Sequence, residues 1–121
     1  MFCVRSQMKT LSSITPDFAA ELIRVLETLG HNVLAAYVAA VKVERCTFDR
    51  SADAGYIYFA RPAPSEHSKD LAAPVAETIS FAEPHWFNID VDHDGYLFGV
   101  EVLGREDIVV RLQSALTLGS S

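Results

Sequence analysis

The stretch DVDHDGYLFGVE, residues 90–101, decides how this chain folds. It satisfies the calcium-loop pattern DxDxDG, followed by the required glutamate at Glu101. A calcium site of the helix-loop-helix type needs a helix leading into Asp90. The residues before it, EPHWFNI, contain a proline and a cluster of aromatic and β-branched side chains, which favour a strand. The sequence therefore predicts that this stretch is not a calcium hand.

The same residues fit a β-hairpin. Asp94 and Gly95 form one of the preferred pairs for a two-residue turn, in which both positions need a positive φ. The register that this turn sets gathers apolar side chains on one face and polar ones on the other. The apolar pairs are Val91 with Phe98, Ile89 with Val100 and Phe87 with Val102; the other face pairs Asp92 with Leu97, Asp90 with Gly99, Asn88 with Glu101 and Trp86 with Leu103.

The acidic face of this hairpin is the candidate site. Asp90, Asp92 and Glu101 lie near Asn88 and are weak candidates for a divalent cation site with oxygen ligands. A solvated polar face and a docking surface for a basic protein remain open as alternatives. The predicted interaction surface comprises Asn88, Asp90, Asp92, Glu101 and Trp86. His85 and His93 flank the strand at opposite ends, too far apart to bind one ion together with this cluster.

Patterns elsewhere predict the remaining elements. Thr15 and Pro16 predict a helix start and Gly30 a stop, with Phe18, Leu22, Val25, Leu26 and Leu29 at helical spacing. A shorter alanine-rich helix follows and turns into a strand near Val41. Residues 42–48 and 56–60 predict a hairpin with Phe48, Ile57 and Phe59 in the core. A loop over 61–74, a strand over 75–81 and an amphipathic helix after Gly104 complete the chain.

These elements predict an α+β fold. We expect an antiparallel sheet of about five strands built from hairpins, with two N-terminal helices and one C-terminal helix. The expected organisation is a single domain over 15–117, a flexible N-terminal arm over 1–14 and a disordered tail over 118–121. Met8 is an alternative first residue of the protein.

The composition of the chain limits which kinds of partner it can bind. The chain has 121 residues, 10 basic and 16 acidic side chains and a net charge of −6, so neither a nucleic acid nor an anionic membrane is expected as a partner. Half of the residues are apolar, and the mean hydropathy is +0.16, which favours a homo-oligomer that covers apolar surface. The sequence shows neither a secretory core nor a membrane span, so we expect a cytoplasmic location.

Signals for catalysis and for bound groups are missing. Cys3 and Cys46 lack the spacing of a zinc site or a disulfide framework, and Cys46 is expected in the core. The sequence has no glycine-rich phosphate loop, GxSxG or HExxH motif, so no cofactor and no enzymatic activity are expected. A hydrolase using Asp49, Asp53 or His85 ranks last, because aspartates in turns usually bind their own backbone.

Two motifs carry a family resemblance. FDRSADAGYIYF and NIDVDHDGYLFGVEVL resemble the two signature halves of the domain-of-unknown-function 2283 family, over residues 43–103. Gly55 departs from that pattern, which usually has a bulky apolar residue there. The resemblance implies a small mixed α/β bacterial protein without established catalysis. By analogy with relatives encoded beside toxin-like proteins, it also implies an antitoxin-like accessory role.

The residues and the resemblance together favour one functional class. We expect a non-catalytic protein-interaction or oligomerisation module. The alternative is a divalent-cation or small-ligand binding domain that uses the acidic hairpin face.

Overall fold

The structure, a computed structural model, describes residues 8–69, 71, 73–81 and 85–120. Its secondary structure confirms the α+β class. The helices are α1 (Leu11–Ile14), α2 (Pro16–Thr28), α3 (Asn32–Ala40) and α4 (Glu106–Ser120). The strands are β1 (Val43–Asp49), β2 (Ala54–Phe59), β3 (Val75–Phe81), β4 (Phe87–Asp92) and β5 (Leu97–Leu103).

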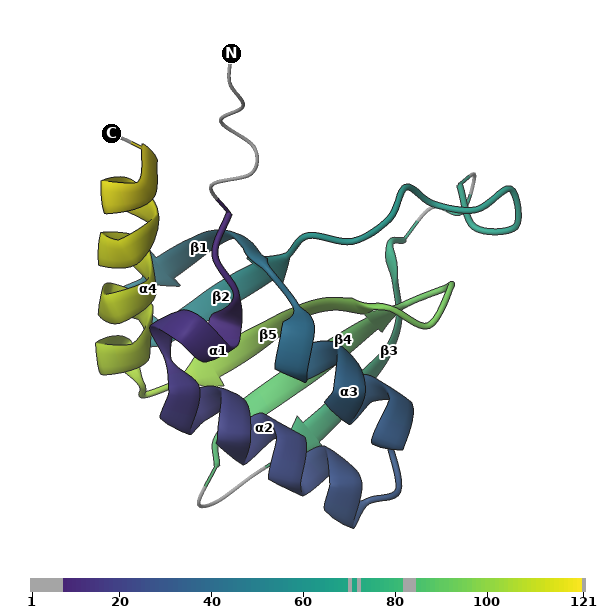
Figure 1. Ribbon diagram of the computed structural model, residues 1–121, viewed down its shortest axis with the longest axis horizontal. Coiled ribbons are helices and arrows are strands. Elements are labelled where there is room, and N and C mark those ends of the chain that lie inside the picture. The colour runs from purple at the N-terminus through teal and green to yellow at the C-terminus, as the bar shows by residue number, and fades with distance from the viewer. Residues whose placement is uncertain (1–7, 70, 72, 82–84, 121) are drawn as a thin grey trace.

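The five strands form one antiparallel sheet in the order β1-β2-β5-β4-β3. Strands adjacent in sequence pair within each half of the chain, and the β2–β5 pairing joins the two halves. The helices pack on one face of this sheet (Figure 1), with α4 lying against β1 and β2. The sheet therefore has an inner face covered by helices and an outer face turned away from them.

The core lies between the helices and the inner face. Phe18, Leu22 and Leu26 of α2 are buried there against strand residues such as Ile57 and Ile89. Each large apolar side chain buried in this way contributes about 1.5 to 3 kcal/mol before conformational entropy is subtracted. Of the core residues predicted for the first hairpin, Ile57 and Phe59 are fully buried, whereas Phe48 is partly buried against the same cluster.

Helix α2 begins and ends close to the predicted residues. Pro16 occupies its first position, and Gly30, with φ +85°, ends it. The amides of Gly30 and His31 donate to the carbonyls of Glu27 and Leu26, which is the Schellman arrangement. Thr15 occupies the N-cap position that the sequence predicts, but its side chain does not cap the helix, because the buried hydroxyl donates instead to the Leu11 carbonyl of α1.

The two ends of the described chain carry more regular structure than the sequence patterns indicate. Thr10 forms a bridge with Lys42, and α1 buries Leu11 completely. This part of the predicted arm, from residue 8 on, therefore packs against the domain, while residues 1–7 lie outside the described residues. At the other end, α4 continues to Ser120, so the expected tail is largely helical in backbone.

The β4–β5 hairpin has the predicted register along most of its length. Phe87 pairs with Val102, Asn88 with Glu101, Ile89 with Val100 and Asp90 with Gly99. A bulge then shifts the register, so that Val91 pairs with Leu97. The predicted pairs Val91 with Phe98 and Asp92 with Leu97 are therefore wrong.

The predicted two-residue turn at Asp94 and Gly95 is also wrong. The Gly95 amide donates to the Asp92 carbonyl and the Asp92 amide to the Tyr96 carbonyl, which leaves a three-residue loop over 93–95. Gly95 has φ +88°, whereas Asp94 is not among the described residues with positive φ. The physical reason is the Asp92 carboxylate, which accepts from the amides of both Asp94 and Tyr96 and stabilises the longer loop.

Candidate functional site

Two rows of residues run across all five strands on the outer face of the sheet, beside a shorter row of Asp49, Ala54 and Leu103. The β-ladder registers define both rows. The first row, from β1 to β3, is Arg45, Tyr58, Gly99, Asp90 and Thr78. The second row is Thr47, Tyr56, Glu101, Asn88 and Ser80. Because successive strand residues point to opposite faces, neighbours such as Cys46, Ile57, Ile89 and Val100 point towards the core.

Tyr56 links the two rows. Its ring lies over Gly99, and its hydroxyl donates to Asp90 Oδ2 at 2.5 Å across the intervening strand β5. A Cβ atom at Gly99 would collide with this ring, so the glycine is what lets the ring cross. Thr78 donates to the other oxygen of Asp90 at 2.6 Å. Burial, the hydrogen bond to Asp90 and the negative charge of Asp90 all raise the pKa of Tyr56, so the phenol keeps its proton.

An aromatic cluster, defined as Tyr56, Tyr58 and Phe98, occupies the middle of the outer face. The ring centroids of Tyr56 and Tyr58 are 4.6 Å apart, and those of Tyr58 and Phe98 are 6.2 Å apart. Phe98 joins the cluster because the bulge in β5 turns it away from the core. Two guanidinium groups flank the cluster, with Arg45 3.6 Å from the Tyr58 centroid and Arg61 4.5 Å from that of Phe98.

The carboxylates of the outer face are bound by neutral donors. Asp90 accepts from two hydroxyl groups, and Glu101 accepts from the Asn88 amide at 2.9 Å. Within the described part of the chain, neither acid forms an ion pair, and Arg45 has no carboxylate partner. The face thus carries an unpaired cation over β1 and β2 and unpaired anions over β5 and β4.

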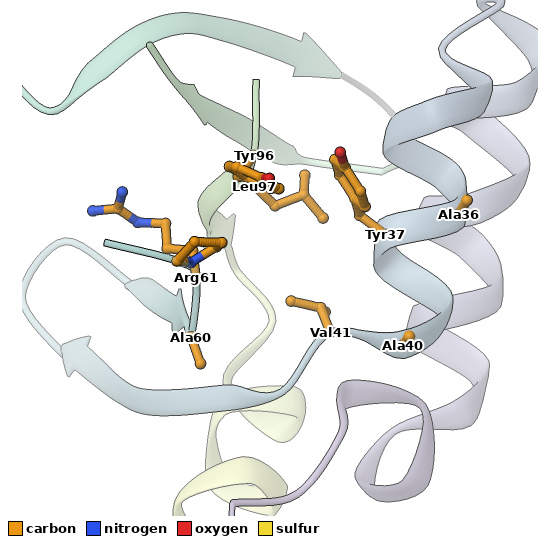
Figure 2. Close-up of a pocket in the computed structure, with 9 residues that line it drawn as sticks. Ala36, Tyr37, Ala40, Val41, Ala60, Arg61, Tyr96 and Leu97 are labelled. Atoms are coloured by element: carbon orange, nitrogen blue, oxygen red, sulfur yellow. The ribbon is translucent and has the colours of Figure 1, made fainter. Parts of the chain in front are cut away.

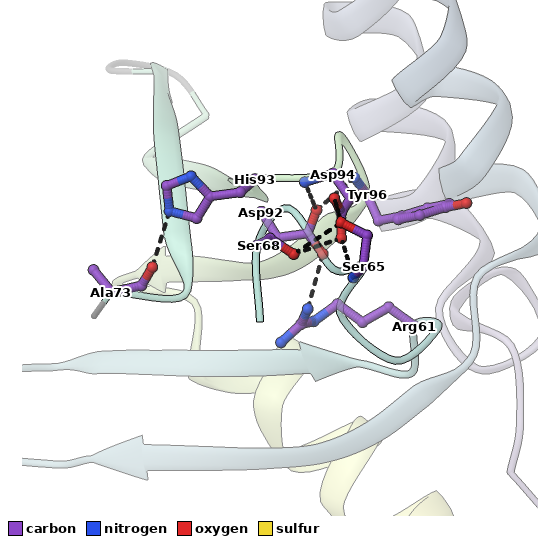
Figure 3. Close-up of polar contacts among 8 residues, drawn as sticks. All are labelled: Arg61, Ser65, Ser68, Ala73, Asp92, His93, Asp94 and Tyr96. Atoms are coloured by element: carbon purple, nitrogen blue, oxygen red, sulfur yellow. Dashed lines mark hydrogen bonds and ion pairs between the residues drawn. The ribbon is translucent and has the colours of Figure 1, made fainter. Parts of the chain in front are cut away.

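Two further aspartates of the calcium-like stretch hold the end of the hairpin (Figure 3). Asp92 is 7% exposed and binds the Arg61 guanidinium at 2.8 Å, in addition to capping the turn. Asp94 accepts from the amide and hydroxyl of Ser65 at 3.0 and 2.6 Å and from the hydroxyl of Ser68 at 2.8 Å. The hydrogen bonds from Ser65 and Ser68 lower the pKa of Asp94 to about 2. These contacts attach the loop after β2 to the hairpin.

The predicted metal candidates have separate roles in the structure. Asp90 binds Tyr56 and Thr78, Asp92 binds Arg61 and its own turn, and Glu101 binds Asn88. Among residues 8–69, 71, 73–81 and 85–120, no group of three or more His, Cys, Asp and Glu side chains is placed to hold a metal ion. Trp86, the remaining residue of the predicted interaction surface, precedes β4, has φ +55° and is 48% exposed.

A polar cluster that the sequence patterns did not indicate joins α2 to the far end of the sheet. Arg105 donates to both carboxylate oxygens of Glu21, at 2.9 and 3.1 Å, and the His85 ring lies 2.6 Å from the same carboxylate. Burial alone would raise the pKa of Glu21, but the hydrogen bonds and charges of Arg105 and His85 bring it below its usual value. These residues are 64 and 84 positions apart in sequence, so no local pattern reveals them.

Of the groups considered for hydrolysis, Asp49 and His85 bind other side chains through their own side chains. Asp49 accepts from the amide and hydroxyl of Ser51 and from the Ala52 amide, which lowers its pKa. Asp53 has φ +51° in the same turn, and its carbonyl accepts from Gly104. His85 is bound to Glu21. Cys46 packs partly buried against the core, and burial raises the pKa of its thiol to about 11, so it stays protonated.

A small pocket of about 210 Å³ lies between α3 and the ends of β2 and β5 (Figure 2). Its walls are mainly apolar, with Tyr37, Val41 and Leu97 among the lining residues. Arg61 also borders it, but its guanidinium extends away from Tyr37 (Figure 2) and binds Asp92. The pocket therefore offers shape and apolar contact, and none of the described residues that line it is a carboxylate, a histidine or a thiol.

The fold and the outer face define a class: a small α+β domain with one helical layer on an antiparallel sheet, whose other face no described helix or strand covers. The model of the family "Protein of unknown function (DUF2283)" matches residues 45–104, and the chain belongs to this family. The match begins at Arg45 on β1 and ends directly after β5, so it contains both rows of the outer face, and all four helices lie outside it. No curated protein and no solved structure matches the chain.

Gly55, which departs from the family pattern, has a structural partner outside the matched region. It lies on the inner face of β2, where an added Cβ would be 2.5 Å from Cγ2 of the buried Val109. Val109 belongs to α4. The missing side chain at Gly55 therefore makes room for the C-terminal helix.

Proposed function

We propose that this protein is a non-catalytic interaction module that binds another protein chain through the outer face of its sheet. The observation that carries the proposal is the contrast between the two faces. Helices cover the inner face (Figure 1), whereas no described helix or strand covers the aromatic cluster on the other. The side of an antiparallel sheet that faces solvent ordinarily carries polar side chains. A cluster of aromatic rings on that side therefore indicates a surface that binds a partner.

The composition of the outer face supports this proposal. Tyrosine, phenylalanine and arginine are enriched in protein interfaces, because their side chains combine large contact area with hydrogen bonding or charge. Tyr56 and Tyr58 are held in place by Asp90, Arg45 and each other, so they lose little conformational freedom on binding. A rigid aromatic centre with polar groups around it is the usual anatomy of a binding surface.

The same contacts argue against catalysis on this face. Asp90 already accepts two hydrogen bonds, and the raised pKa of Tyr56 removes it as a base or nucleophile. Among the described residues that line the pocket beside α3, the titratable side chains are those of Tyr37, Tyr96 and Arg61. Binding is therefore the function that the described residues support best.

The cation-binding alternative is weaker. Each of Asp90, Asp92 and Glu101 would have to exchange an existing hydrogen bond for a metal ligand, and a bound ion would leave Arg61 of the buried ion pair without its partner. Calorimetric titration with calcium, magnesium and manganese tests this alternative. Heat that saturates at millimolar ion, and that disappears in an Asp90→Asn variant, would favour it over the interaction module.

Photo-crosslinking tests the proposed function. A benzoylphenylalanine is placed at Thr47, which is exposed on the outer face, or at Arg24, which is exposed on α2 in the helical layer. The full chain is then irradiated in cells, and the products are separated by mass. The proposal predicts covalent protein adducts from position 47 and none above background from position 24. Adducts from neither position, or from position 24 alone, would contradict it.

A further inference from the structure

We propose that the partner bound by the outer face is a second copy of this chain, related by a twofold axis that runs parallel to the strands between β2 and β5. This inference rests on the proposed function of that face. The two copies would meet sheet to sheet, with the two aromatic clusters in contact at the axis.

The distribution of unpaired charge identifies the partner. Arg45 lies at one end of the first row, and Asp90 lies three strands away in the same row, about 14 Å at the usual strand spacing. The described residues provide neither a carboxylate for Arg45 nor a cation for Asp90 and Glu101. The first row of the outer face thus carries a cation on β1 and an anion on β4, with aromatic rings between them. The exposed Asp49, further along β1, accepts hydrogen bonds from Ser51 in its own turn.

The separation of opposite charges along this row determines which kind of partner surface fits it. A uniformly basic partner would satisfy Asp90 and Glu101 but would repel Arg45, and a uniformly acidic partner would do the reverse. A surface with both charges in the opposite order satisfies all three groups. A twofold interface presents such a surface, because each copy meets the same patch of the other turned around.

The strand order determines where the twofold axis must lie. A rotation about an axis between β2 and β5 places β1 of one copy over β4 of the other, and β2 over β5. Because the axis is parallel to the strands, each row stays at its own level. Arg45 then lies opposite Asp90 of the other copy, Thr47 opposite Asn88, and Tyr56 opposite Glu101. Facing sheets are about 10 Å apart, a gap that an arginine side chain spans to reach a carboxylate.

The size of the face predicts a weak dimer. Four strands about 4.8 Å apart and about 20 Å long cover roughly 400 Å² of each copy. A standard stable interface buries about 800 Å² per partner, so this contact falls at the small end of specific interfaces. We therefore expect a dissociation constant in the micromolar range, governed by the aromatic centre and the exchanged charges.

Sedimentation velocity of the purified full chain from about 5 μM to about 500 μM tests the inference. The wild type should pass from monomer to dimer across this range. Arg45→Glu should raise the dissociation constant at least about tenfold, because the new carboxylate faces Asp90 of the other copy. The control Arg24→Glu makes the same charge change on the exposed part of α2 and should leave the dissociation constant unchanged. Circular dichroism confirms that both variants are folded.

The outcomes separate this inference from the proposed function. A wild-type chain that stays monomeric to about 500 μM overturns the dimer, and so does a dimer that Arg45→Glu does not weaken. If crosslinks still form at position 47 in cells, the outer face binds a different protein and the proposed function stands. If those crosslinks are also absent, both proposals fail.

Discussion

Tyr56 on β2 donates a hydrogen bond of 2.5 Å to Asp90 on β4, although strand β5 lies between them. The two residues are 34 positions apart and come from the two halves of the family motif. Their contact depends on the missing side chain at Gly99. One bond therefore couples the first hairpin to the second across the middle of the outer face.

Tyr56→Phe tests the contribution of this bond to stability. The change removes the hydroxyl and leaves Asp90 with Thr78, so we expect the free energy of unfolding to fall by about 1 to 2 kcal/mol. Urea denaturation followed by circular dichroism measures it. Tyr37→Phe is the matched control, because its hydroxyl has no hydrogen bond within the described structure. Equal losses in the two variants would show that the bond to Asp90 contributes nothing specific.

Two substitutions at Asp92 separate the turn cap from the ion pair. Asp92→Asn keeps an oxygen for the amides of Asp94 and Tyr96 but loses the charge that faces Arg61, and should cost about 1 to 2 kcal/mol. Asp92→Ala loses both interactions and should cost about 3 kcal/mol or more. Asp107→Ala, at an exposed position of α4, is the control and should lower the free energy of unfolding by at most about 1 kcal/mol. Thermal unfolding of all three variants supplies the comparison, and identical losses for Asn and Ala would rule out the cap.

Much of the fold could be predicted from the sequence, because most of its signals are local. Periodicity locates α2, and Asp94 and Gly95 mark the reversal between β4 and β5. The loop itself was predicted one residue too short, since backbone preference alone does not reveal that the Asp92 side chain caps it. Because the loop is one residue longer than predicted, Phe98 lies on the outer face instead of in the core.

The candidate site was only partly predictable. Asn88, Asp90 and Glu101 could be assigned to one face from the hairpin register alone. The aromatic cluster was missed because it depends on the β2–β5 pairing, which joins distant segments that no turn connects. The cluster of Glu21, His85 and Arg105 was missed for the same reason.

A double substitution tests the fit between the sheet and the C-terminal helix. Gly55→Ala places a methyl group against Val109 and should destabilise the protein by about 1 to 3 kcal/mol. Val109→Ala alone should also destabilise it, because it leaves a cavity in the core. The double variant should lose less than the sum of the two, since the new methyl group occupies the vacated space. Strictly additive losses in chemical denaturation would show that the two residues do not compete for space.

Stability at acid pH should depend on Asp94. Hydrogen bonds from Ser65 and Ser68 lower its pKa from 3.8 to about 2, so the stabilisation is fully present above pH 3.8 and is lost as the pH falls towards 2. Asp94→Asn should therefore lose less stability over this interval than the wild type. Urea midpoints from pH 5 to pH 2 measure the difference, and parallel profiles for Asp94→Asn and wild type would contradict it.

The central claim, that a second copy of this chain binds the outer face, is tested most directly by amide NMR spectra recorded at low and at high protein concentration. The account predicts shifts on concentration that are confined to the outer-face residues of β1, β2, β5 and β4, centred on Tyr56 and Tyr58, with the amides of α2 and α3 unchanged. Spectra that do not change with concentration, or changes confined to the helical layer, would contradict it.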